Sequence, residues 1–167
     1  MKTLEGRLNK IILPGRSNNI EPYTWLAKKL NKSGFNVLLL KYNFGSHSQW
    51  NKVLGEQRGG TIGLVNNEVT AAISYLKSQS SVDPERISLL GCSMGTWVGL
   101  QAMVKFPELK ALMMLSPICA VKGKSFQTYE GTKVLAEEFG VRYLFLVASQ
   151  EDRHSEIFQL QLKNQNT

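Results

Sequence analysis

The residues best suited to chemistry form a pentapeptide, GCSMG, at positions 91–95. It fits the pattern GxSxG, in which glycines on both sides of a serine allow a turn sharp enough to lift the hydroxyl clear of the backbone. Such a turn strains the serine, and the positive end of a following helix points to where an oxyanion would form. The pattern makes Ser93 a candidate nucleophile if a strand precedes the pentapeptide and a helix follows it.

The elements that must position this serine can be read from the apolar pattern. Short apolar runs alternate with stretches of helical period, which is typical of a parallel sheet covered by helices. Strands are expected at 10–13, 35–40, 87–90, 110–115 and 143–148, helices at 22–32, 65–77, 94–105, 131–139 and 155–162, and a turn at 83–85. The pentapeptide therefore joins an expected strand to an expected helix. The 167 residues show no repeat or linker, so one domain, 1–167, is expected.

With these elements in this order, the chain resembles the α/β-hydrolase family, in particular its small esterase-like and dienelactone-hydrolase-like members. The resemblance runs from LPG at 13–15, through DPERI at 83–87 and the pentapeptide, to ASQED at 148–152. It implies a three-layer α/β/α sandwich with a mostly parallel sheet. It also implies a serine hydrolase of esterase type that acts on a small ester or acyl substrate through Ser93. The backbone N–H groups of Met94 and Arg16 would form the oxyanion hole, and no metal or organic cofactor is needed.

The same resemblance implies an acid and a base for the catalytic triad. Asp152 would be the acid that orients a histidine, with a solvated loop carboxylate as the plain alternative. The histidine should lie roughly 20–30 residues beyond the acid, enough for a helix, a strand and two loops. Because 167 − 152 = 15 residues follow Asp152, we expect a C-terminally shortened member without the last strand and the usual base. His154 is the candidate replacement, although it would share a loop with Asp152, whereas His47 is expected to be an ordinary loop residue.

Further expectations concern the substrate site and the sheet edge. Pro117 and Ile118 follow the strand at 110–115, where relatives place residues that line the substrate site. A sheet that ends at residues 143–148 would expose an apolar edge, so a homodimer paired along it is expected, which light scattering can test. Trp25 and Trp97 lie in expected helices and are predicted to be core residues.

Composition excludes several other classes of protein. Lys and Arg exceed Asp and Glu by 20 − 13 = +7, but they are scattered and no nucleic-acid-binding motif is present, so no nucleic-acid partner is expected. No apolar run approaches the ~20 residues that span a bilayer and no signal peptide is visible, so we expect no membrane association and a cytoplasmic location. The two cysteines lack metal-site spacing.

Two alternatives remain beside the enzyme. Loss of the base would leave a non-catalytic binding or scaffold protein with a hydrolase-like fold. A nucleotide-binding doubly wound domain would also alternate strands and helices, but the sequence lacks GxGxxG and GxxxxGK[ST].

Overall fold

A parallel sheet forms the centre of the molecule in the computed structural model, which describes residues 7–43, 63–117 and 143–147. Its strands lie in the order β2-β1-β3-β4-β5, and every neighbouring pair is parallel. The bounds are β1 (Arg7–Leu13), β2 (Asn36–Leu39), β3 (Val82–Cys92), β4 (Ala111–Leu115) and β5 (Tyr143–Val147). All five strands predicted from the sequence are confirmed, and parallel pairing brings their carboxyl ends to one edge of the sheet.

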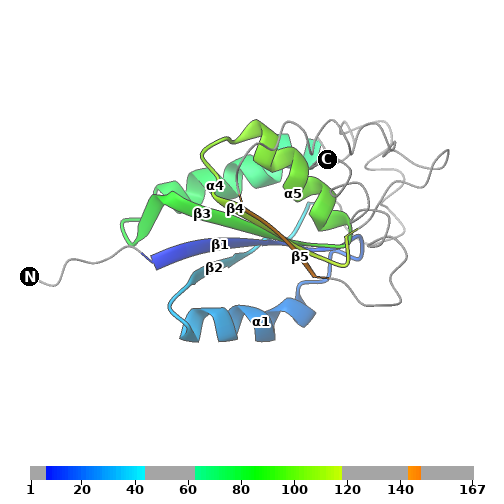
Figure 1. Cartoon of the computed structure of the whole chain (residues 1–167), viewed down its shortest axis with the longest axis horizontal. Helices are drawn as coiled ribbons and strands as arrows, with labels where there is room; N and C mark the ends of the chain where they lie inside the picture. Colours follow the sequence, from blue (N-terminus) through cyan, green and yellow to red (C-terminus); the bar gives the residue numbers. More distant parts are fainter. Residues whose placement is uncertain (1–6, 44–62, 118–142, 148–167) are drawn as a thin grey trace, which may run out of the picture.

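Helices cover both faces of this sheet (Figure 1). Helix α1 (Glu21–Lys32) lies on one face, and α4 (Thr70–Lys77) and α5 (Met94–Lys105) lie on the other. A π-helical turn, η2 (Val65–Val69), leads directly into α4. The predicted three-layer α/β/α sandwich is therefore confirmed for the described residues. The helices expected at 131–139 and 155–162 lie outside them.

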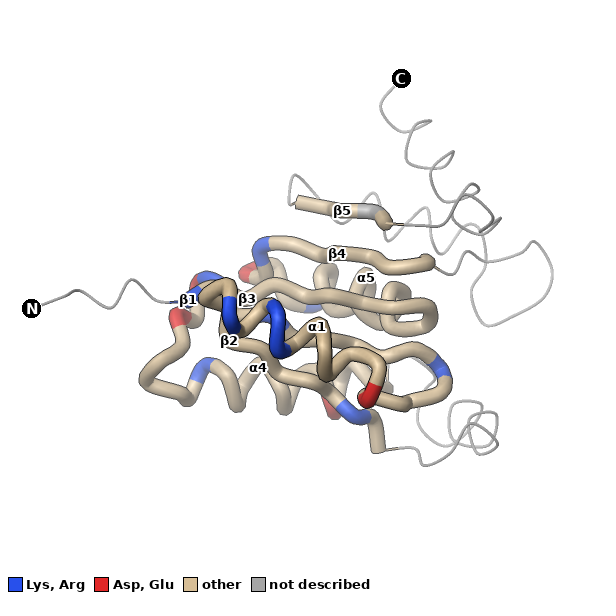
Figure 2. The backbone as a smooth tube through the Cα atoms, turned by 90° about the horizontal axis from the view of Figure 1, so that it is seen from below, with Lys and Arg blue, Asp and Glu red and all other residues tan. Residues whose placement is uncertain are grey.

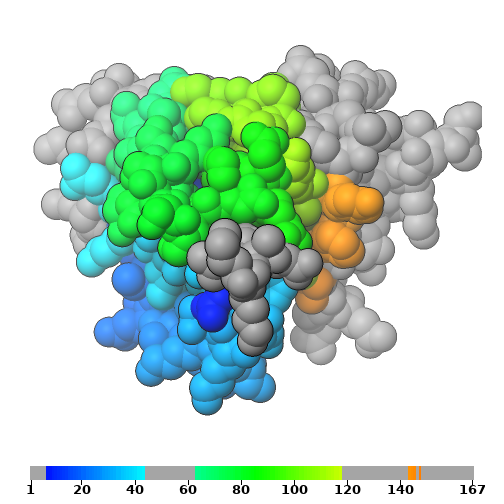
Figure 3. Space-filling model, turned by 90° about the vertical axis from the view of Figure 1, so that its left-hand side faces the viewer, coloured from blue at the N-terminus to red at the C-terminus, as the bar shows by residue number. Residues whose placement is uncertain are grey.

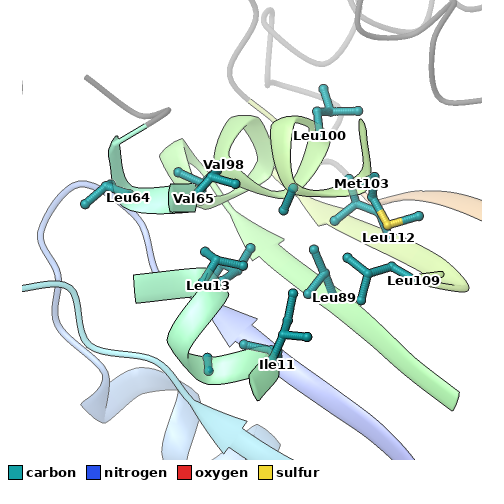
Figure 4. Packing of buried hydrophobic residues seen from close by; sticks show 14 of the residues in the cluster. Ile11, Leu13, Leu64, Val65, Leu89, Val98, Leu100, Met103, Leu109 and Leu112 are labelled. Carbon is teal, nitrogen blue, oxygen red and sulfur yellow. The ribbon is translucent and has the colours of Figure 1, made fainter. Parts of the chain in front are cut away.

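The main hydrophobic core lies between the sheet and the layer of α4 and α5 (Figure 4). Ile11, Leu13 and Leu89 point from β1 and β3 into this layer, as the alternation of side chains along a strand requires. Helix α5 is apolar on nearly all sides, and nine of its twelve residues are buried. A helix with this composition is stable only when it is enclosed, so α5 is held firmly against the sheet.

Two details of the sequence prediction were wrong. Residues 83–85 do not form a turn before β3. They lie within β3, where its pairing with β1 shifts register. The buried side chain of Asn9 bonds to this segment, because its Nδ2 donates a hydrogen bond of 2.9 Å to the carbonyl of Asp83. Trp25 is 63% exposed rather than in the core, whereas Trp97 is buried as predicted. Trp25 is two positions, or about 200° around α1, from Tyr23, which faces the sheet.

Strand β5 is the last described strand at one edge of the sheet, and it carries exposed apolar side chains. Tyr143, Phe145 and Val147 are all more than half exposed, and the two rings are stacked with centroids 6.5 Å apart. Figure 3 shows this strand, in orange, at the surface. Alternate residues share a face, so these three form one apolar strip. Pairing of two copies along this edge stays a prediction.

The surface gives two further observations on partners. No helix among the described residues is long and apolar enough to span a bilayer. Figure 2 shows the Lys and Arg residues of the described segments distributed over several elements rather than gathered in one patch. The cytoplasmic location and the absence of a nucleic-acid partner stay predictions.

Candidate active site

Backbone strain marks one edge of the sheet. Three non-glycine residues in the described segments have positive φ angles: Asn18 at 53°, Ser93 at 51° and Ser116 at 45°. They follow the carboxyl ends of β1, β3 and β4, three strands that are adjacent in the sheet. Each such residue costs about 1–3 kcal/mol, and such positions cluster at functional sites. The carboxyl edge is also where ligands bind in open α/β sheets, so it is the candidate active site.

Ser93 occupies the sharp turn between β3 and α5. Its backbone angles are φ 51° and ψ −119°, and α5 begins at the next residue, Met94. The Ser93 N–H donates to the carbonyl of Leu115 at 3.0 Å, which ties the turn to β4. The Ser93 carbonyl accepts hydrogen bonds from the N–H and the hydroxyl of Thr96, at 3.0 and 2.6 Å. The backbone of Ser93 is therefore held by both β4 and the first turn of α5.

The two glycines of the pentapeptide are required by close approach of three backbone segments. A Cβ on Gly95 would lie 2.8 Å from the carbonyl carbon of Leu13 and closer still to its oxygen. A Cβ on Gly91 would lie 2.6 Å from the carbonyl carbon of Gly95. The ends of β1 and β3 therefore touch the first turn of α5 with no space for a side chain between them.

The loop after β1 contacts Ser93 directly. A Cβ on Gly15 would lie 3.3 Å from the Cβ and 3.7 Å from the Oγ of Ser93. The Gly15 carbonyl accepts a 2.9 Å hydrogen bond from the N–H of Asn18, which closes a turn with Arg16 next in the chain. Arg16 thus follows directly on a residue that packs against Ser93, and its part in an oxyanion hole stays a prediction. Met94 is the first residue of α5, so its N–H is one of the four that have no acceptor within the helix.

Tyr23 of α1 lies beneath this loop. Burial and a hydrogen bond with the Cys92 thiol raise the pKa of Tyr23 to about 12, although the Gly15 backbone N–H acts in the opposite direction. Tyr23 therefore contacts the two chain segments that meet at Ser93. The thiol of Cys92 therefore points toward α1. Because neighbouring side chains on a strand point to opposite faces, this is not the direction expected for Ser93.

The raised pKa of Tyr23 predicts a loss of stability at alkaline pH. Above pH 10 the unfolded chain loses the phenolic proton, whereas the folded chain retains it until about pH 12. The free energy of unfolding must therefore fall as pH rises through this interval. Tyr23→Phe should reduce the loss without abolishing it, because burial also raises the pKa of Tyr42. Urea midpoints at pH 9 and pH 11 measure this, with exposed Tyr75→Phe as the matched control; an equal fall in wild type and Tyr23→Phe would contradict it.

Other predicted site residues are only partly described. Pro117 is buried, two residues beyond β4. Ile118, Asp152 and His154, and also His47, lie outside the described residues, so the predictions for them stay predictions. Sequence reasoning missed Asn18, although an asparagine shortly after Pro-Gly is a recognisable signal for a turn with positive φ.

The family comparison can now be set beside this geometry. The model of the Dienelactone hydrolase family matches residues 18–152, well over half of the chain. The chain belongs to the dienelactone hydrolase family. By family and by fold it is an α/β hydrolase, as the sequence resemblance implied. No curated protein matches this family member in sequence.

Solved structures agree with this fold. A candidate dienelactone hydrolase from Klebsiella pneumoniae subsp. pneumoniae has a TM-score of 0.63 at 11% identity, covering 98% of this chain and 87% of its own. A glucuronoyl esterase from Solibacter usitatus has a TM-score of 0.64 at 10% identity, covering 93% and 60%. A dienelactone hydrolase-like promiscuous phosphotriesterase from metagenomic libraries has a TM-score of 0.61 at 14% identity, covering 86% and 70%. At these sequence identities, the similarity shows only that this dienelactone hydrolase family member shares its fold with the three proteins.

Proposed function

We propose that this dienelactone hydrolase family member is a serine hydrolase of esterase type, which acts on a small ester or acyl substrate through Ser93. The observation that carries the proposal is the backbone of Ser93, which is held at φ 51° between β3 and α5 with Gly15 packed against it. A strained serine at the carboxyl edge of a parallel sheet suits a nucleophile better than it suits a structural turn.

The proposed reaction has two steps. The Ser93 oxygen attacks the carbonyl carbon of the ester while a base takes the hydroxyl proton. The carbonyl oxygen becomes an oxyanion, which accepts hydrogen bonds from the backbone N–H groups of Met94 and Arg16. The carbon–oxygen bond to the alcohol then breaks and the alcohol leaves with the proton. Water attacks the acyl group on Ser93, which releases the carboxylic acid and restores the serine hydroxyl.

The acid, the base and the substrate are assigned from the sequence and the family. Asp152 is proposed to orient the base, for which His154 is the candidate, and Pro117 and Ile118 are proposed to border the substrate. Two of the similar structures are named an esterase and a phosphotriesterase, which favours an ester as the substrate class. The N-terminal end of α5 adds a positive field where the oxyanion would form.

A fluorophosphonate probe tests the proposal, because it forms a covalent bond with activated serines only. Peptide mass spectrometry of the full-length chain should find the label on Ser93, and Ser93→Ala should lose it. Ser116→Ala, a change at the other strained serine of this edge, is the matched control and should keep the label. Absence of label on Ser93 would overturn the proposal and favour a non-catalytic binding protein.

A further inference from the structure

Asn18 is a buried polar residue whose side chain both donates to and accepts from the backbone of one other residue, Tyr42. It is 3% exposed and has a φ of 53°. Its Nδ2 donates to the carbonyl of Tyr42 at 2.7 Å, and its Oδ1 accepts from the N–H of Tyr42 at 2.8 Å. Both hydrogen bonds are buried, where they are stronger than at the surface. The side-chain amide thus pairs with Tyr42 as a neighbouring strand would, and we refer to this pair of hydrogen bonds as the Asn18 clamp.

The clamp joins the loop after β1 to the segment after β2. Tyr42 is itself a firm anchor, because it is 2% exposed and belongs to the hydrophobic core. On the other side of the clamp, the backbone N–H of Asn18 donates to the carbonyl of Gly15 at 2.9 Å. Gly15 in turn packs against Ser93. A continuous series of contacts therefore runs from Tyr42 through Asn18 and Gly15 to Ser93.

This series holds the loop on both sides of Arg16 and Ser17. Arg16 and Ser17, between Gly15 and Asn18, are exposed and lie at the surface of the molecule. Donors that stabilise an oxyanion act only if they are held in place before the reaction begins. Displacement by about 1 Å of a group that positions the reactants can cost about a hundredfold in rate.

We propose that Asn18 is a positioning residue, which holds the Gly15–Arg16 segment against Ser93 so that the Arg16 N–H is aimed at the oxyanion. This inference rests on the proposed esterase function. Asn18 would act through Gly15, to which it is bonded and which packs against Ser93. Asparagine suits the position because it tolerates positive φ and also supplies one donor and one acceptor.

The test compares two glycine substitutions in the same turn of the full-length protein. Asn18→Gly keeps the positive φ without strain but deletes both hydrogen bonds of the clamp. Ser17→Gly adds the same backbone freedom one residue away and removes only an exposed hydroxyl, whose contact with the Asn19 N–H is 3.4 Å long. The readouts are kcat and KM for p-nitrophenyl acetate, together with amide hydrogen exchange measured by NMR.

Asn18→Gly should lower kcat at least tenfold with KM changed less than about threefold, because the donors are misplaced in the transition state rather than in substrate binding. The amide of position 18, which donates to the Gly15 carbonyl, should exchange at least tenfold faster, whereas that of Thr96 in α5 should be unchanged. Ser17→Gly should resemble the wild type in both readouts. A merely structural role would lower the amount of folded protein and speed exchange throughout, without a selective loss of kcat.

Three results would count against the inference or against the function, and they are distinguishable. Unchanged exchange of the amide at position 18 in Asn18→Gly would overturn the positioning role whatever the activity. Faster exchange with unchanged kcat would also overturn it, because the loop would then be irrelevant to the rate. Absence of both turnover and Ser93 labelling in the wild type would overturn the esterase function, and exchange alone would then decide whether the clamp holds the loop.

Discussion

Gly95→Ala is expected to destabilise the protein by about 3–5 kcal/mol, a large share of the about 5–15 kcal/mol that a domain of this kind has in total. The added Cβ would meet the backbone carbonyl of Leu13, which ends β1, a strand that is paired on both sides within the sheet. A backbone group cannot rotate away as the end of a side chain can. Either β1 or the first turn of α5 must move, and both are held by the core.

The matched control lies one turn further along the same helix. A Cβ on Gly99 would lie 2.7 Å from Cδ1 of Leu112, the far end of a flexible side chain. Gly99→Ala also gains up to about 1 kcal/mol of helix propensity, so its net effect should stay within about 1 kcal/mol of zero. Urea unfolding followed by circular dichroism measures both variants. Equal stability of Gly95→Ala and the wild type would show that the close approach of β1 and α5 is not required.

Ser93→Ala is expected to reduce ester hydrolysis by roughly 10³- to 10⁶-fold, the range found when a nucleophile of a serine triad is removed. The substitution deletes the attacking oxygen and leaves the turn in place, because alanine carries the same Cβ at the same backbone angles. Turnover of p-nitrophenyl acetate under saturating conditions measures the effect. Equal turnover by the wild type and Ser93→Ala would mean that the hydrolysis is background and that Ser93 is not the nucleophile.

A second substitution at this position separates chemistry from stability. Ser93→Gly also removes the oxygen but relieves the cost of the strained backbone, which is about 1–3 kcal/mol for a residue with a Cβ. Glycine loses about 0.5–1 kcal/mol of this gain through the greater entropy of the unfolded chain. Ser93→Gly should therefore be about 1 kcal/mol more stable than Ser93→Ala, with activity equally low. Such a result would show that the strain at Ser93 is retained for function.

Much of the fold could be predicted from local sequence because its signals are local. The apolar runs that form β1 to β5 and the helical period of α1 and α5 each depend on a few neighbouring residues. The turn at Ser93 was predictable for the same reason, since glycines on both sides of a serine indicate that backbone segments approach closely there. Residues 83–85 illustrate the limit: Asp-Pro-Glu is typical of a turn, but in the fold the side chain of Asn9, 74 residues away from Asp83, bonds to this segment of β3.

The candidate site was less predictable than the fold because its parts meet only after folding. The distance from Gly15 to Ser93 depends on how β1 pairs with β3, and the clamp depends on Tyr42 after β2. An isolated asparagine in the sequence gives no sign of which backbone its amide will pair with. The prediction for Trp25 was wrong because a large aromatic residue in an amphipathic helix faces the core only if its angular position around the helix matches that of the other core-facing residues.

The contact between β1, β3 and the first turn of α5 also limits how this protein can be redesigned. A Cβ added at Gly91 or Gly95 would meet main-chain atoms, so neither position can be exchanged for a larger or more polar residue. New selectivity would have to be engineered from exposed positions along the same rim, such as Arg16, Ser17 and Ser116. Directed evolution of a variant library should accordingly accumulate beneficial changes on the rim and leave the pentapeptide untouched.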